Sequence, residues 1–132
     1  MSLKITLKPN ERIIIDGAVV TNGHAKSVLI IENNVTILRQ KDILNEKEAN
    51  TPARRIYFVV QLMYIDEEHL TLHHKNYWKL VQDYIAASPS GLPLIDQISD
   101  KILKNQFYQA LKLSRKLIDY EQEVISSART SA

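Results

Sequence analysis

The chain has 132 residues, of which 45% are hydrophobic and 24% charged, and its formal net charge is +2. That length suffices for one ordinary core and is too short for two comfortable domains, so we expect a single domain over residues 1–132. The lack of cysteine excludes disulfides, thiolate zinc sites and a cysteine nucleophile, and the small net charge restricts any nucleic-acid site to a local patch.

Residues 1–40 have the pattern of β-strands. Leu3, Ile5 and Leu7 alternate with polar residues, which is the two-residue period of a half-buried strand. Further strands are predicted between turn signals such as Asp16-Gly17 and Asn22-Gly23, over residues 12–15, 18–21, 26–32 and 35–39. We therefore expect a small antiparallel β-meander, curled enough to approach a barrel.

Residues 50–127 have the pattern of α-helices. The first strong helix is predicted over residues 51–65, capped by Asn50 or Thr51 and buried on most sides. Later helices are predicted from residue 66 to a loop at residues 88–91, over 94–103, and over 105–126, with a disordered tail at 128–132. The predicted fold class is α+β: a small N-terminal antiparallel meander followed by a C-terminal helical bundle with a long final helix.

The first turn of the helix at residues 51–65 carries two arginines. Arg54 and Arg55 follow Pro52, although the positive end of a helix dipole favours acidic residues there. Cations beside exposed backbone N–H groups suit an anion such as a phosphate. The pair is equally compatible with a structural role, in which it contacts Glu46, Glu48 or a carboxylate at the sheet edge. Both interpretations stay open.

Basic residues also follow the predicted strands. Such charges usually form a solvated face, but here they are compatible with half of a phosphate-contacting surface. Together with the two arginines at the helix start, they make up the predicted RNA-binding residues: Lys4, Lys8, Arg12, Arg39, Lys41, Arg54 and Arg55.

The histidines and acids match no catalytic pattern. His69 and His73 share a helix face, as two metal ligands do, but the residues between them lack the glutamate of a zinc protease. Asp66 or Glu67 would supply a third ligand only through a coincidence of packing. No nucleophile elbow or phosphate-binding glycine loop is present. We therefore expect no metal, no cofactor, no catalytic residues and no enzymatic activity.

The final helix has a heptad seam of apolar residues spaced three, four, three and four apart. Such a seam usually packs on neighbouring helices of the same chain, and an exposed part of it is able to accept a partner helix. The candidate partner-binding residues are Ala110, Leu113, Leu117, Tyr120 and Val124.

Three segments resemble motifs of the FlbT family of flagellar biosynthesis regulators. Residues 3–12 resemble its L-x-L-K-P-x-E-R start, and residues 16–23 its N-G-A-V-x-x-N-G turn, with Asp16 in place of the more usual Asn. The third segment is the helix start, T-P-A-R-R-I-Y-F at 51–58 with Q-L-M-Y-I at 61–65. The resemblance extends over essentially the full length and is less distinctive in the helical half.

The resemblance implies a post-transcriptional regulator in the cytoplasm of flagellated bacteria. Such proteins act on the 5′ untranslated region of flagellin mRNA, where they reduce translation and promote decay, alongside a small partner, FlaF. The alternative function is a protein-interaction adaptor or chaperone-like partner of flagellin or FlaF that affects the message indirectly. No membrane partner is expected, because no apolar run approaches the roughly 18 residues of a membrane span. A homo-oligomer is compatible with the small sheet and the long amphipathic helix, which both offer surfaces to cover.

Overall fold

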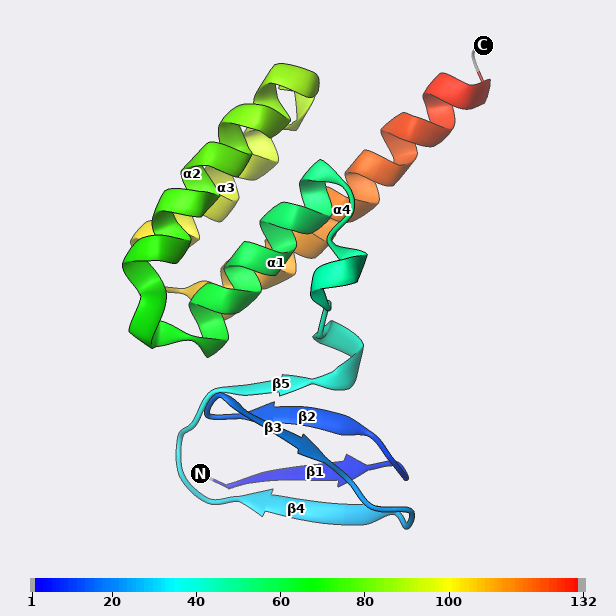
Figure 1. Cartoon of the computed structure of the whole chain (residues 1–132), viewed down its shortest axis with the longest axis vertical. Coiled ribbons are helices and arrows are strands. Elements are labelled where there is room, and N and C mark those ends of the chain that lie inside the picture. Colours follow the sequence, from blue (N-terminus) through cyan, green and yellow to red (C-terminus); the bar gives the residue numbers. More distant parts are fainter. Residues whose placement is uncertain (1, 131–132) are drawn as a thin grey trace. The chain divides into compact units, whose positions relative to one another are not determined.

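The structure is a computed structural model that describes residues 2–130 (Figure 1). The chain divides into two compact units, the first ending at Ile43 and the second beginning at Leu44. Among the described residues, five β-strands belong to the first unit and four α-helices to the second. The predicted α+β class, with β-structure first and a long final helix, is therefore confirmed.

The strands of the first unit form two small antiparallel sheets. In one sheet, β1 (Leu3–Leu7) pairs with β4 (Ser27–Ile31), with Leu7 opposite Ser27. In the other, β2 (Arg12–Ile15) lies between β3 (Ala18–Thr21) and β5 (Ile37–Arg39) (Figure 1). The strand positions agree with those predicted. The pairing is not that of a meander, however, because β1 pairs with β4 rather than β2, and the strands described between residues 2 and 130 close into no barrel.

Two similar turn sequences behave differently, which explains the pairing. Asp16 and Gly17 both have positive φ, 50° and 82°, and form the tight β2–β3 hairpin. Asn22-Gly23 does not form the predicted hairpin turn. The side chain of Asn22 instead donates to the carbonyl oxygens of Lys8 (2.8 Å) and Ala25 (3.0 Å). These bonds hold the 22–25 loop beside the end of β1, so the next strand joins β1.

The first unit has a small core. Ile5, Leu7 and Ile13 are buried together, and partly buried side chains surround them: Ile15, Leu29, Ile31 and Ile37. All four residues of β3 are exposed, as are Val28 and Ile30 on β4. Hydrogen bonds at the turns therefore make a large contribution to the order of this unit.

The second unit is a bundle of four helices. It contains α1 (Pro52–Ile65), α2 (Leu70–Ala87), α3 (Leu92–Leu103) and α4 (Phe107–Thr130), and the short 3-10 helices η2 (Glu46–Glu48), η3 (Glu67–His69) and η4 (Pro89–Gly91). Helix α1 packs against both α2 and α4, and α3 packs against α4. As predicted, α1 is buried on most sides, with Ile56, Val60 and Met63 fully inaccessible.

Several helix boundaries differ from the predicted ones. Helix α2 begins at Leu70, after the 3-10 helix η3, rather than at residue 66, and α4 begins at Phe107 rather than at residue 105. Helix α3 begins at Leu92, two residues earlier than predicted, because Pro93 is tolerated in its first turn. Helix α4 continues to Thr130, beyond the predicted end at 126. Of the predicted tail at 128–132, residues 131 and 132 lie outside the described residues.

Candidate nucleic-acid interface

An open groove of about 860 Å³ lies within the first unit. It is formed by the end of β1 and the turn after it, the residue before β4, the end of β5 and the short 3-10 helix η1 (Gln40–Asp42). Among its described lining residues, four cations, Lys8, Lys26, Arg39 and Lys41, accompany one carboxylate, Glu11. The groove is therefore a local positive site on a chain whose net charge is only +2.

Glu11 holds Arg39 in a fixed position. The Arg39 Nη2 atom donates to the Thr6 carbonyl oxygen (2.8 Å) and lies 3.2 Å from Glu11 Oε2. The other Glu11 oxygen accepts the Lys8 backbone N–H (2.9 Å), and this bond is the main reason that the pKa of Glu11 is lowered, with Arg39 adding to the effect. The Arg39 side chain stays 38% exposed. An arginine has five N–H donors, so donors remain for a ligand.

The neighbouring lysines are positioned by backbone structure. Gln40 accepts the Arg12 backbone N–H through its side-chain oxygen (2.6 Å), which attaches the start of η1 to β2 and places Lys41 at the groove. The pairing of Leu7 with Ser27 brings the adjacent Lys8 and Lys26 to the same end of their sheet. The charges thus come from segments far apart in sequence.

The arginines at the start of α1 belong to the second unit. Thr51 caps the helix by accepting the Arg54 backbone N–H (3.2 Å), and the Arg54 guanidinium donates to Asn50 (3.0 Å). Arg55 is exposed. The Ala53 backbone N–H donates to the Glu121 carboxylate of α4 (2.9 Å). The anion at this helix end is therefore a carboxylate of the chain itself, and neither arginine forms an ion pair with Glu46 or Glu48 in the described part of the chain.

Comparisons with known proteins agree on one family. The family model described as "Flagellar protein FlbT" matches residues 3–125. The chain belongs to the FlbT family. It is 47% identical over 125 residues to a probable flagellum biosynthesis repressor protein FlbT 1 of Bradyrhizobium diazoefficiens, a match covering 94% of this chain and 85% of the relative.

Two relatives from Caulobacter extend this result. The chain is 41% identical to a probable flagellum biosynthesis repressor protein FlbT of Caulobacter sp. strain K31, over 93% of this chain and 95% of the relative. It is 39% identical to the flagellum biosynthesis repressor protein FlbT of Caulobacter vibrioides, over 93% of this chain and 89% of the relative. These names describe repressors rather than enzymes. No solved structure matches the chain.

The three FlbT motifs contain residues of the groove and of the start of α1. The opening motif at residues 3–12 supplies Lys8 and Glu11 to the groove, and the helix-start motif supplies Thr51, Arg54 and Arg55. The turn motif at 16–23 contains the tight hairpin and the bridging Asn22. The motifs that resemble the family therefore include residues that shape the groove as well as residues that line it.

The groove contains some of the predicted RNA-binding residues. Lys8, Arg39 and Lys41 line it, whereas Lys4 and Arg12 do not. Lys4 lies opposite Ile30 on the outer face of β1 and β4. Lys26 also lines the groove and was not predicted, because its approach to Lys8 depends on the β1–β4 pairing, which a meander lacks.

The heptad seam on α4 is mostly occupied within the second unit. Ala110 and Leu117 are fully buried, and Leu113 and Tyr120 are half-buried. The Tyr120 hydroxyl donates to Ser90 (2.6 Å). Val124 is exposed. The seam thus serves packing within the chain along most of its length, and Val124 is the position where it faces solvent.

The helices of the chain do not meet the requirements of a membrane span in the part that the structure describes. Between residues 2 and 130, none is both long enough and apolar enough to cross a bilayer.

Proposed function

We propose that this FlbT-family protein is a post-transcriptional regulator of flagellin synthesis that binds the 5′ untranslated region of flagellin mRNA in the cytoplasm. Binding there represses translation or promotes decay of the message. Family membership supports a regulatory role in flagellum synthesis, since its relatives are named flagellum biosynthesis repressors. The observation that carries RNA binding is the groove with four cations and one carboxylate.

The groove suits a sugar–phosphate backbone. Lysines attract phosphates as point charges, and the anchored guanidinium of Arg39 presents donors in a planar arrangement that matches two phosphate oxygens. The described residues that line the groove include no aromatic side chain on which a base could stack. The groove therefore contributes backbone contacts, which suit the exposed phosphates of a folded leader loop.

The test is RNA binding by the purified full-length chain over a salt series. The variant K8Q/K26Q/K41Q removes three exposed charges from the groove, and K47Q/K75Q/K79Q removes three exposed charges from the second unit. If each groove lysine contacts a phosphate, the groove variant binds flagellin leader RNA more weakly, and the slope of log K against log salt becomes shallower by about 2. The matched control retains the wild-type slope.

Two results would contradict the proposal. One is that both triple variants lose the same affinity for RNA and show the same shallower slope of log K against log salt. That result would indicate attraction to the overall charge of the protein. The other is a wild-type protein that binds the leader RNA only when flagellin or FlaF is added. That second result favours the adaptor function.

A further inference from the structure

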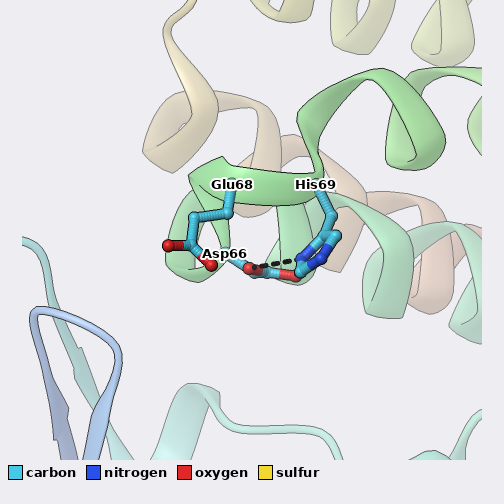
Figure 2. A group of neighbouring side chains, drawn as sticks. All are labelled: Asp66, Glu68 and His69. Carbon is cyan, nitrogen blue, oxygen red and sulfur yellow. Dashed lines mark hydrogen bonds and ion pairs between the residues drawn. The ribbon is translucent and has the colours of Figure 1, made fainter.

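The corner between α1 and α2 brings together side chains that commonly bind metals. Asp66 directly follows α1 as its C-cap, and the 3-10 helix η3 (Glu67–His69) comes next. One ligand atom from each of Asp66, Glu68 and His69 lies within 4.8 Å of the other two. Figure 2 shows these side chains on one side of the turn, with Asp66 between Glu68 and His69. Asp66 occupies the N-cap position of η3, and its carboxylate reaches the His69 side chain at the end of that turn.

A buried histidine, His73, forms a hydrogen bond to Asp66. His73 is only 5% exposed, and its Nε2 lies 3.0 Å from Asp66 Oδ2. Its Nδ1 is buried and has no hydrogen-bond partner among the described residues. With the proton on Nε2, His73 donates to Asp66 and leaves no buried N–H unsatisfied, so we assign that tautomer.

This arrangement is typical of a ligating carboxylate. Carboxylates that bind metals are usually held in turn by an outer hydrogen-bond partner, which fixes their orientation. The hydrogen bond from His73 Nε2 (3.0 Å) supplies such an outer partner and fixes the orientation of the Asp66 carboxylate. The Nδ1 atom of His69 lies 3.0 Å from the same Asp66 Oδ2 and 3.1 Å from Oδ1.

We propose that Asp66, Glu68 and His69 bind a divalent transition-metal ion of the zinc type, with His73 as the residue that positions Asp66. The ion takes the place of the hydrogen bond between His69 Nδ1 and Asp66, and the neutral imidazole of His69 carries its single proton on Nε2 when the ion is bound. Mg²⁺ and Ca²⁺ prefer oxygen ligands alone, whereas one imidazole and two carboxylates suit Zn²⁺. Water completes the coordination.

The distances are compatible with zinc. Zinc–nitrogen and zinc–oxygen bonds of about 2.1 Å place two donors on a tetrahedral ion roughly 3.4 Å apart. The three ligand atoms lie within 4.8 Å of one another, so binding requires only small rotations of Glu68 and His69, whose side chains are exposed. The bound ion would connect the end of α1 to the turn that begins α2.

The experiment is zinc titration of the untagged full-length chain, by calorimetry and by competition with a chromophoric chelator. E68Q and H69Q remove ligands from exposed positions. E67Q and H24Q are the matched controls, because Glu67 lies in the same turn and His24 is an exposed histidine elsewhere in the chain. We expect one zinc per chain, bound at least about tenfold more weakly in E68Q, H69Q and H73Q and less than twofold more weakly in the controls.

Thermal unfolding provides a second readout. Zinc should raise the Tm of the wild-type and E67Q proteins by more than the Tm of H69Q, since an ion bound only to the folded state stabilises it according to its affinity. Because His73 is buried, H73Q is interpreted only if its circular dichroism matches the wild type. The proposal is overturned if zinc does not bind at micromolar concentration, or if E67Q and H24Q lose as much affinity as E68Q and H69Q.

Discussion

The two units of this chain differ in what holds them in shape. The first unit buries a small cluster around Ile5, Leu7 and Ile13, and its strand β3 is exposed throughout. Its turns are fixed by hydrogen bonds of side chains such as Asn22, Glu11 and Gln40. The second unit depends on packed helices with many fully buried apolar side chains, among them Ile56, Met63, Ile98, Ile102 and Leu117.

This difference indicates a division of roles between the units. The cations of the groove come from strand ends and turns, where exposed side chains are positioned by the backbone and contribute little to the core. The helical unit contributes most of the buried apolar surface. We therefore expect substitutions in the helical core to change stability, and substitutions in the groove to change RNA affinity.

The largest effect is expected from Ile98→Ala on α3. Ile98 is fully buried, so truncation leaves a cavity and should cost about 2–5 kcal/mol of unfolding free energy. Urea unfolding followed by helical circular dichroism measures this loss. The control is Leu103→Ala on the same helix, where the side chain is 69% exposed and the cost should stay below about 0.5 kcal/mol. RNA affinity of the folded protein should be unchanged in both, and a large loss of affinity in folded I98A would break the division of roles.

A smaller effect is expected at alkaline pH from Tyr77 on α2. Burial raises the pKa of Tyr77 to about 12 from an ordinary value of 10.0, against a hydrogen bond to Ser99 (2.8 Å) that lowers it. Between pH 10 and pH 12 the folded protein keeps the Tyr77 hydroxyl proton, whereas the unfolded chain releases it. The contribution of Tyr77 to the unfolding free energy is therefore complete below pH 10 and is lost as the pH rises toward 12. At 1.36 kcal/mol per pKa unit, the loss approaches about 3 kcal/mol.

The variant Tyr77→Phe isolates this contribution. It removes the ionisable hydroxyl and keeps the ring, so the difference in unfolding free energy between wild type and Y77F should change steadily from pH 10 to pH 12. A constant difference over that range would show that Tyr77 ionises as easily in the folded protein as in the unfolded chain.

The sequence predicts the positions of the elements well because the local signals are strong. Alternation at Leu3, Ile5 and Leu7 determines a strand, and the Thr51-Pro52 start followed by an apolar run determines α1. Strand pairing is harder to predict, because Asp16-Gly17 and Asn22-Gly23 look alike in sequence. Only the structure shows that the Asn22 side chain bonds to the end of β1.

The candidate sites were harder to predict for the same reason. Lys26 approaches Lys8 through the pairing of β1 with β4, which no local pattern reveals. The spacing of His69 and His73 suggested two equivalent ligands, whereas burial gives them different roles beside Asp66. At the start of α1, the carboxylate that accepts the Ala53 backbone N–H belongs to Glu121 of α4. These two residues are 68 positions apart in sequence, so no local pattern predicts their contact.

The smallest change in stability is expected from the double substitution R54A/R55A at the start of α1. Arg55 is exposed and Arg54 bonds through its side chain to Asn50, so the unfolding free energy should change by less than about 0.5 kcal/mol. The matched control is K75A/K79A on α2, which removes the same charge from exposed positions. If the RNA footprint extends to the second unit, R54A/R55A weakens binding more than the control does, and less than the triple variant of the groove.

The chemistry of that contact can be separated further with R54K/R55K. Because Glu121 already accepts the Ala53 backbone N–H, an RNA phosphate near this helix end must be held by the arginine side chains rather than by that backbone group. Lysine keeps the charge but lacks the planar pair of donors, so retained affinity indicates attraction to charge, and lost affinity indicates bidentate recognition of phosphate. A fall in Tm in R54A/R55A without loss of RNA affinity would instead assign both arginines to the structure of the helix start.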